Sequence, residues 1–248
     1  MLKTRKILSS IHPCLYFLLP FVVAMSSCSD DEEVLLEMTV DDAAALIGFS
    51  MADQTYGAVN DLNYVAEDVI GRVACDETET LQWSYTDSGA IEDLFVSAEI
   101  LESYTHLCGG EETLDYAYNA DQIIFSDLYD LDHDIEGDWL IQGVQLGGNV
   151  LIYNGLYNRL GDWTYQFDSG HTEYVEYLST LINIRYDRIA GKIVSGVSTF
   201  TIEGTSNDHQ GYNYSGDLEF FSGLAIITFS GGERFEIDLD TGNVTKLE

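Results

Sequence analysis

Hydrophobic residues recur every three or four positions from residue 39 to residue 73, which is the period of an amphipathic helix. Thr39 and Asp42 form the sequence pattern of a capping box, so the helix is expected to begin there. Gly48 and Gly57 can bend or split it, at a cost of about 1 kcal/mol each relative to alanine. The hydrophobic face of this helix consists of Ala44, Ile47, Met51, Ala58, Leu62, Val65, Val69 and Val73. We expect this hydrophobic face to pack on a sheet rather than to bind a partner.

From about Leu81 onward the hydrophobic period falls to two, which is typical of strands with one buried and one solvated face. Three segments show this alternation, and each set is expected to share one face of its strand. The sets are Leu178, Thr180, Ile182, Ile184 and Tyr186; Tyr212, Tyr214, Leu218 and Phe220; and Phe235, Ile237 and Leu239.

Glycine-centred segments such as Gly147-Gly148 and Gly231-Gly232 separate these strands and suit tight hairpins, because glycine supplies the positive φ that such turns require. The pattern predicts a mainly β fold, with an N-terminal amphipathic helix followed by a long antiparallel β-meander. The sheet is expected to be open, and it could be curved or barrel-like. Residues 111–137 are the least regular part, which suggests a boundary or an excursion at the sheet edge. We nevertheless expect a single domain over residues 39–248.

The first 27 residues have the layout of a secretory signal peptide. Three basic residues, Lys3, Arg5 and Lys6, precede an apolar stretch of about 15 residues, whereas a membrane-spanning helix needs roughly 20. The stretch ends in Met25-Ser-Ser-Cys28, which resembles the lipobox of bacterial lipoproteins. The resemblance implies cleavage before Cys28 and acylation of that cysteine, so that fatty acyl chains hold the protein to a membrane. The alternative is an ordinary signal peptide with Cys28 incidental.

The five residues after Cys28, namely Ser29, Asp30, Asp31, Glu32 and Glu33, resemble the acidic export tag of surface-displayed Bacteroidota lipoproteins. Such a tag is an address recognised by a receptor, because carboxylates gain nothing electrostatically beside anionic headgroups. We expect residues 28–38 to be a lipidated acidic tether and the protein to be anchored in the outer membrane, facing the cell exterior. A merely solvated linker and retention on the periplasmic side are the alternatives.

Charge limits the partners. The chain has 43 acidic and 10 basic residues, and removal of the signal leaves a net charge of about −36. This field disfavours nucleic acid and anionic membrane surfaces, and leaves cations, basic proteins and neutral glycans as ligands. The remaining cysteines, Cys75 and Cys108, are expected to form a disulfide in an oxidising compartment, stabilising the fold by roughly 3.5 to 4 kcal/mol in the chain-entropy model. At this spacing we do not expect a redox-active or metal-binding pair.

Three segments, residues 192–204, 214–218 and 235–244, resemble uncharacterised Bacteroidota lipoproteins with an N-terminal helix and a long β-meander. The resemblance covers the signal and roughly the last 60 residues. It concerns turns and strands, so it implies a fold and brings no catalytic residues.

An acidic cluster between residues 127 and 138 is the densest group of candidate ligands. An EF-hand loop from Asp130 fails, because Ile135 occupies the glycine position and Ile141 the position of the bidentate glutamate. We expect a solvated acidic loop, with a Ca²⁺ site as the alternative. In a strand, alternate positions would instead place five carboxylates on one face. These five candidate ligands are Asp130, Asp132, Asp134, Glu136 and Asp138.

No motif of nucleophilic catalysis is found, and the four histidines after the signal lack metal-binding spacing. Trp83, Trp139 and Trp163 could form an aromatic platform for sugars, although core packing is the expectation. We therefore expect a non-enzymatic binding or accessory module for a glycan, protein or cation, without a cofactor. A carbohydrate-active hydrolase using paired carboxylates and a structural subunit of an outer-membrane assembly are the alternatives. An exposed apolar face or an unpaired sheet edge would favour assembly, and an aromatic or concave patch would favour ligand binding.

Overall fold

The computed structural model describes most of the chain after residue 37. The described ranges are residues 38–72, 74–88, 94–109, 111–126, 129–145, 148–165, 171–206 and 211–248. The signal peptide, Cys28 and the export tag at residues 29–33 lie outside these ranges and stay predictions. Within the ranges, no helix has the length and apolar character needed to cross a membrane.

The predicted helical segment is present, but it consists of three short pieces. Helix α1 spans Val40–Met51, helix α2 spans Ala58–Tyr64, and the π-helical turn η1 spans Val65–Val69. The Thr39 side chain accepts a hydrogen bond from the Asp42 N–H, and the Asp42 carboxylate accepts one from the Thr39 N–H. This is the predicted capping box, and it begins α1.

The predicted hydrophobic face of the helix is the buried face of α1, α2 and η1. Its described members, Ala44, Ile47, Met51, Ala58, Leu62, Val65 and Val69, are each at most 1 % exposed. Val73 lies outside the described residues. Gly57 splits the segment and is the N-cap of α2. Gly48 lies within α1, where a Cβ would be 2.5 Å from the carbonyl oxygen of Gly242, so the absent side chain allows the helix to approach that turn.

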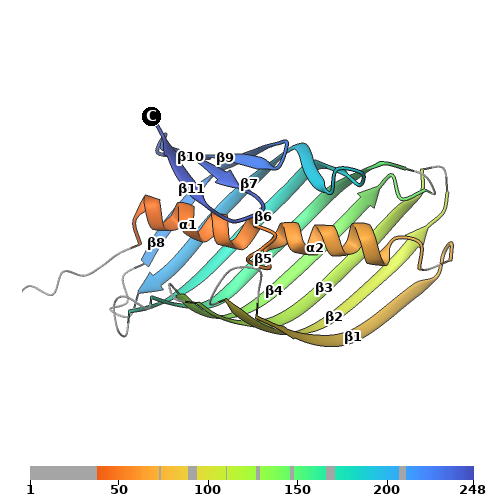
Figure 1. Cartoon of the computed structure of the whole chain (residues 1–248), viewed down its shortest axis with the longest axis horizontal. Coiled ribbons are helices and arrows are strands. Elements are labelled where there is room, and N and C mark those ends of the chain that lie inside the picture. The colour runs from red at the N-terminus through yellow and green to blue at the C-terminus, as the bar shows by residue number, and fades with distance from the viewer. Residues whose placement is uncertain are drawn as a thin grey trace, which may run out of the picture. The chain divides into compact units, whose positions relative to one another are not determined.

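The strands form one antiparallel sheet in which each strand pairs with the next along the chain. They are β1 (Thr78–Asp87), β2 (Phe95–Leu107), β3 (Thr113–Phe125), β4 (Tyr129–Gln142), β5 (Val150–Tyr165), β6 (Thr172–Asp187), β7 (Lys192–Ser206), β8 (Gly211–Phe221), β9 (Leu224–Phe229), β10 (Arg234–Asp238) and β11 (Val244–Leu247). Strands β1 and β11 are the edges of the described sheet, which is open. Figure 1 shows the sheet curving around the helices, which lie on its concave side. The predicted helix and antiparallel meander are confirmed.

The interpretation of residues 111–137 as a boundary or an edge excursion is wrong. This stretch holds β3 and most of β4, which are the third and fourth of the eleven described strands and pair with each other along the whole of β3. Its outward positions are rich in acids, which resembles loop composition, while its inward positions are buried.

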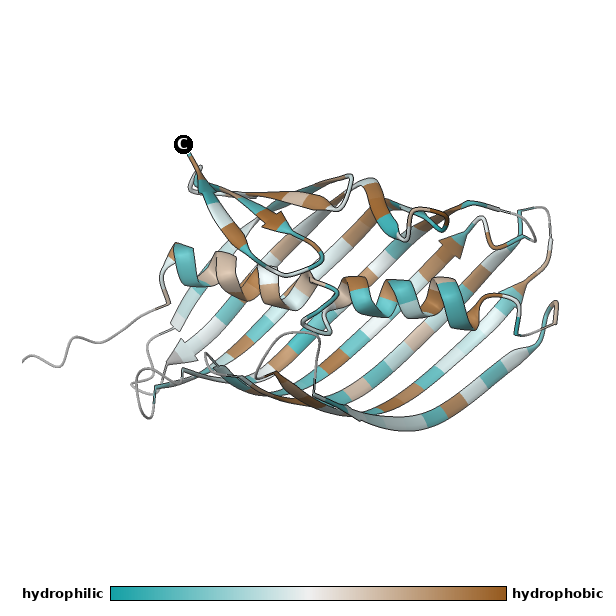
Figure 2. Cartoon of the chain, in the orientation of Figure 1, coloured by the Kyte–Doolittle hydropathy of each residue, from teal (hydrophilic) through white to brown (hydrophobic). Residues whose placement is uncertain are grey.

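Burial alternates along each of the long central strands and defines two faces of the sheet. In β3 and β4 the buried side chains include Tyr116, Tyr118 and Trp139, and they face the helices on the concave side. The intervening residues lie on the convex face, as the alternating hydropathy bands along the strands in Figure 2 illustrate. The core therefore lies between the concave face and the helices.

A bulge in β6 overturns one predicted strand face. Asn183 has a φ of 51°, and the pairing with β5 and β7 shifts around it. Ile184 and Tyr186 are consequently buried, whereas Ile182 is 37 % exposed on the convex face. The predicted set from Leu178 to Tyr186 therefore does not share one face.

Candidate functional site

Several acidic side chains on the concave side are bound by tyrosine hydroxyls. The buried Glu102 carboxylate accepts hydrogen bonds from Tyr64, at 2.9 Å, and from Tyr116, at 2.8 Å. Tyr212 donates in the same way to the buried Glu173, at 2.7 Å. A buried carboxylate is destabilising unless donors replace the water that it loses. Part of the high tyrosine content therefore serves to satisfy buried acids.

Asp61 links α2 to the sheet. Its carboxylate accepts a hydrogen bond from Tyr118 on β3. The Tyr118 ring crosses Gly137 of β4, where a Cβ would lie 2.0 Å from the ring. Burial raises the pKa of Asp61 to about 7, although the Tyr118 hydrogen bond and the charge of Arg159 act in the opposite direction.

Arg159, 1 % exposed, is the buried cation of the concave side. Its Nη2 donates to Gln122 Oε1, and its guanidinium lies 5.6 Å from the centroid of the Phe49 ring. The Nε and Nη1 groups have no hydrogen-bond partner among the described residues. Burial and the charge of Arg159 hold the pKa of His133 well below its usual value. Because Arg159, Gln122 and His133 are closed off from solvent, they contribute to packing rather than to an accessible site.

The raised pKa of Asp61 predicts a pH dependence of folding. A carboxyl group whose pKa is higher in the folded state contributes stability that is fully present below about pH 3.8 and is lost as the pH rises through about 7. Urea unfolding at pH 5 and pH 7 should therefore show a smaller loss of stability for Asp61→Asn than for the wild type. Asp68→Asn, an exposed change on the adjacent η1, is the control and should follow the wild type. Parallel pH profiles for Asp61→Asn and the wild type would contradict the assignment.

The acidic cluster lies on the convex face of β4, so the expectation of a solvated acidic loop is wrong. Asp130, Asp132, Asp134, Glu136 and Asp138 occupy alternate positions of this strand, as the extended alternative requires. Their side chains do not converge on a metal site. Among the described residues, the one group of His, Cys, Asp and Glu side chains with suitably close ligand atoms lies elsewhere.

These carboxylates have acidic neighbours across the strands. Asp134 lies opposite Asp121 of β3, and Asp132 lies opposite Asp162 of β5. Like charges in directly opposite positions destabilise a sheet. Desolvation and the nearby Asp121 carboxylate raise the pKa of Asp134. The outward side chains of β2 to β5 include no lysine or arginine, so the charged residues on this part of the convex face are all carboxylates.

A row of large apolar side chains crosses the convex face from β4 to β8, and we call it the apolar stripe. Successive members are direct or diagonal neighbours across adjacent strands. The members and their exposed fractions are Leu140 at 43 %, Leu156 at 46 %, Ile182 at 37 %, Val197 at 47 % and Phe221 at 37 %. Asp138 lies directly opposite Leu156, and Glu219 lies directly opposite Val197. The stripe is thus an exposed apolar band bordered by carboxylates.

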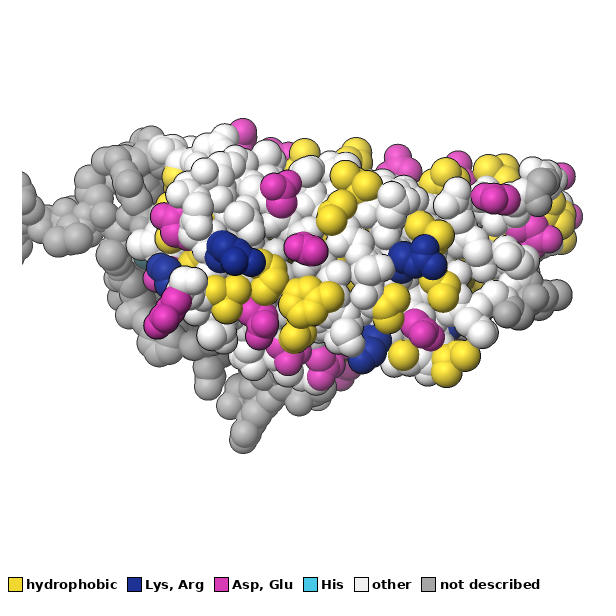
Figure 3. All heavy atoms as spheres, turned by 90° about the horizontal axis from the view of Figure 1, so that it is seen from above, with side chains coloured by type: hydrophobic (Ala, Val, Ile, Leu, Met, Phe, Trp, Pro, Cys, Tyr) yellow, Lys and Arg dark blue, Asp and Glu magenta, His cyan; other side chains and the backbone are white. Residues whose placement is uncertain are grey.

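Two hollows open on the sheet near this band. One, of about 390 Å³, adjoins the stripe at Val197 and is also lined by Asp217, Glu219 and Ile226. Figure 3, which shows the molecule from above, shows hydrophobic, acidic and basic side chains side by side at the surface. A partner side chain that enters the hollow would meet both an apolar wall and two acids.

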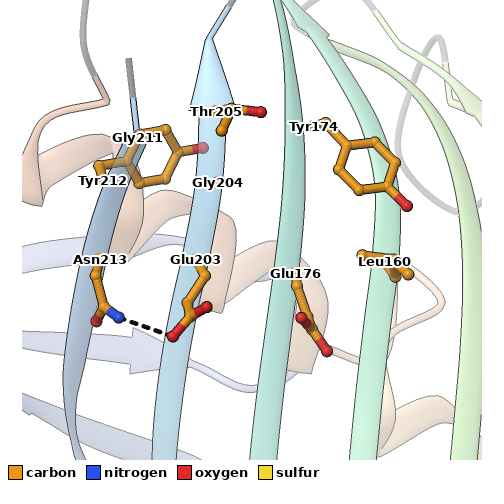
Figure 4. A pocket seen from close by; sticks show the side chains of 9 residues that line it. All are labelled: Leu160, Tyr174, Glu176, Glu203, Gly204, Thr205, Gly211, Tyr212 and Asn213. Atoms are coloured by element: carbon orange, nitrogen blue, oxygen red, sulfur yellow. Dashed lines mark hydrogen bonds between the residues drawn. The ribbon is translucent and has the colours of Figure 1, made fainter. Parts of the chain in front are cut away.

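The second hollow, of about 500 Å³, lies farther along β5 to β8. Figure 4 shows the Tyr174 ring next to Leu160, with Glu176 and Glu203 side by side on the neighbouring strands and the Asn213 amide donating to Glu203. Tyr174 is 51 % exposed, and Glu176 lies directly opposite Glu203 in the β6–β7 pairing. The arrangement offers the exposed Tyr174 ring, the partly buried Tyr212 ring and two carboxylates in an open depression.

The tryptophan platform is absent from the described surface. Trp139 and Trp163 are at most 1 % exposed, and Trp83 is partly buried with its ring 5.3 Å from that of Tyr64. All three serve core packing, as expected. The described histidines do not come together either, since His133 is in the core and His171 contacts Glu173 at 2.9 Å. His209 lies outside the described residues. The predicted disulfide between Cys75 and Cys108 is present.

No protein-family model, curated protein or solved structure matches this chain. Function therefore has to be argued from its own geometry. The apolar stripe was missed from sequence because its members are far apart in the chain and only the strand register aligns them. The alternation along each strand could have placed single members of the stripe on the outward face, but it does not show that they align across strands.

Proposed function

We propose that this protein is a lipid-anchored, non-enzymatic binding protein of the outer membrane, which faces the cell exterior and docks a protein partner on the apolar stripe. The observation that carries the proposal is the exposure of five large apolar side chains in one continuous band over five strands. Contiguous exposed apolar surface is typical of a protein interaction site, whereas scattered exposed residues are not.

The chemistry of the band favours a partner with basic groups around an apolar centre. Asp138 and Glu219 border the stripe, and Asp217 and Glu219 line the hollow at its β7 end. A lysine or arginine of the partner could enter that hollow while aliphatic contacts form along the stripe. Opposite charges around an interface promote encounter and register, and buried apolar contacts supply most of the affinity. The strong negative charge disfavours pairing of two copies through this face.

Glycan binding and hydrolysis have less support from the geometry. The tryptophans that could stack on sugar rings face the core, which leaves Tyr174 as the exposed ring of the larger hollow. A glycosidase acid usually has its pKa raised by a sheltered environment. Glu203 is exposed and Glu176 is half-buried in an open depression. The paired carboxylates therefore lack the shelter that general acid catalysis requires.

Crosslinking on intact cells tests the proposal. The double variant Leu156→Ser/Val197→Ser removes two exposed members of the stripe and should lower partner capture at least about tenfold, because two aliphatic side chains that the partner buries each contribute on the order of 1 kcal/mol of hydrophobic burial. The matched control is Leu101→Ser/Ile123→Ser, which changes convex-face residues that are 49 % and 39 % exposed outside the stripe. The captured partner is identified, and its affinity for each purified variant is then measured.

The control should retain capture and affinity. Equal capture by the stripe variant and the wild type would refute docking on the stripe, and so would equal losses in both double variants. Because each substituted residue is at least 39 % exposed, both variants should unfold at nearly the wild-type urea concentration.

A further inference from the structure

Three side chains of types that commonly bind metals lie close together where the end of β2 contacts the turn before β1. The ligand atoms of Cys75, His106 and Cys108 all lie within 4.8 Å of one another. Among the described residues, no other group of histidine, cysteine and acidic side chains is this close. In the observed state the two sulfurs are joined in a disulfide, so neither is a thiolate ligand.

The backbone around these residues is held together independently of the disulfide. The Asp76 N–H donates to the His106 carbonyl at 2.6 Å, and the His106 N–H donates to the Glu77 carbonyl at 3.3 Å. The Cys108 N–H also donates to Asp76 Oδ1, at 3.3 Å. These hydrogen bonds join the segment that carries Cys75 to the end of β2, which carries His106, and to Cys108 directly after it. Cleavage of the S–S bond would therefore leave the two thiols near the imidazole.

The surroundings suit a metal. Cys75 is exposed and Cys108 is half-buried, so solvent and a reductant can reach the pair. The Glu112 carboxylate lies 3.6 Å from His106 Nε2. Ligating histidines commonly place their other ring nitrogen against a carboxylate, which fixes the ring and raises its basicity. Glu112 can therefore position His106 without being a ligand itself.

We propose that Cys75, His106 and Cys108 form a redox-controlled binding site for Zn²⁺ or a similar thiophilic divalent cation. A dithiol reductant first cleaves the disulfide by exchange, so that the reductant becomes a disulfide and the protein gains two thiols. The cation then displaces the two thiol protons to solvent and binds two thiolates and one imidazole, with water as the fourth ligand. Two sulfurs and one nitrogen are a typical ligand set of tetrahedral zinc. Because the disulfide consumes both sulfurs, the oxidised chain lacks the site.

Titration of a purified chain of residues 29–248, in which Cys75 and Cys108 are the only cysteines, with Co²⁺, followed by Zn²⁺ competition, tests the proposal. The chain reduced by a dithiol, with the reductant then removed, should bind one Co²⁺ with thiolate-to-cobalt charge-transfer absorption, and Zn²⁺ should abolish the signal. The oxidised chain should show at least about 100-fold weaker binding and no such absorption, because it lacks thiolates. Cys75→Ser/Cys108→Ser should also show none.

His106→Ala should weaken Co²⁺ binding by the reduced chain at least about tenfold, because it removes a direct ligand. His171→Ala is the matched control and should bind as the wild type does, since both side chains are 16 % exposed and lie near a glutamate. Equal affinity of His106→Ala and the wild type would overturn the site, as would reduced, folded protein without charge-transfer absorption. If circular dichroism shows that reduction unfolds the chain, refolding by Zn²⁺ supports the proposal, and failure to refold overturns it.

Discussion

Replacing Trp139 by alanine is expected to lower the free energy of unfolding by about 3–5 kcal/mol, which is the usual range for truncating a buried tryptophan. Trp139 is fully buried on the concave side of β4. Its ring lies 5.6 Å from that of Tyr116, 5.3 Å from that of Tyr118 and 6.2 Å from that of Tyr153. The substitution would leave a cavity among aromatic rings that are themselves held by the sheet and helices. Urea unfolding monitored by far-ultraviolet circular dichroism measures the loss.

Leu140→Ala is the matched control for this prediction. Leu140 follows Trp139 directly but points to the convex face and is 43 % exposed, so its truncation should cost less than about 1 kcal/mol. A one-residue shift in strand register would exchange the two faces, because side chains alternate with a period of two. Similar losses for the two variants, or a larger loss for Leu140→Ala, would therefore contradict the register of β4 and the placement of its five carboxylates.

Local patterns in the sequence account for the helices and much of the sheet. The capping box at Thr39 and Asp42 and the apolar period that follows it depend on residues within a turn or two of each other. The C-terminal strands alternate cleanly and have glycines at their turns, so Phe235 and Ile237 were placed correctly on the buried face. These features need no knowledge of distant contacts.

The central strands β3 and β4 were harder to recognise because their inward faces are not uniformly aliphatic. His133 and Gly137 occupy inward positions of β4, where the sequence shows no apolar residue. Gly137 is needed because the Tyr118 ring occupies the place of its side chain. The sequence alone does not reveal that a side chain of one strand fills the space beside a glycine of the next, because this depends on the strand register. The dense acids on the outward face then made a strand look like a loop.

The candidate sites depend even more on register. The bulge at Asn183 leaves Ile182 in the apolar stripe while it turns Ile184 and Tyr186 into the core, and nothing in the local alternation signals that shift. From the sequence, His106 was not grouped with the two cysteines as a metal ligand, although it lies on β2 only two residues before Cys108. Its proximity to Cys75 follows from hydrogen bonds between β2 and the turn before β1. Both sites are products of tertiary pairing.

No lysine or arginine lies beside the carboxylates on the convex face of β2 to β5, and the stability of the fold does not explain this arrangement. The chain has ten lysines and arginines, yet none lies on the outward positions of β2 to β5. A single base opposite Asp134 would relieve the repulsion from Asp121. Proteins that keep a destabilising arrangement commonly do so where function requires it. An acidic face beside an apolar band is consistent with the basic partner proposed for the stripe.

Replacing Cys28 by serine is expected to abolish fatty-acid incorporation and to move the protein from the membrane fraction to the soluble fraction. Each buried CH₂ of an acyl chain contributes roughly 0.8 kcal/mol to membrane binding, so loss of two or three chains removes the anchor entirely rather than weakening it. Metabolic labelling with a radioactive fatty acid, followed by cell fractionation, measures both effects. Cys14→Ser is the control, because Cys14 lies in the segment predicted to be removed and its loss should change neither result. Continued labelling of the Cys28→Ser chain would disprove the anchor, and with it the presentation of the apolar stripe from the outer membrane.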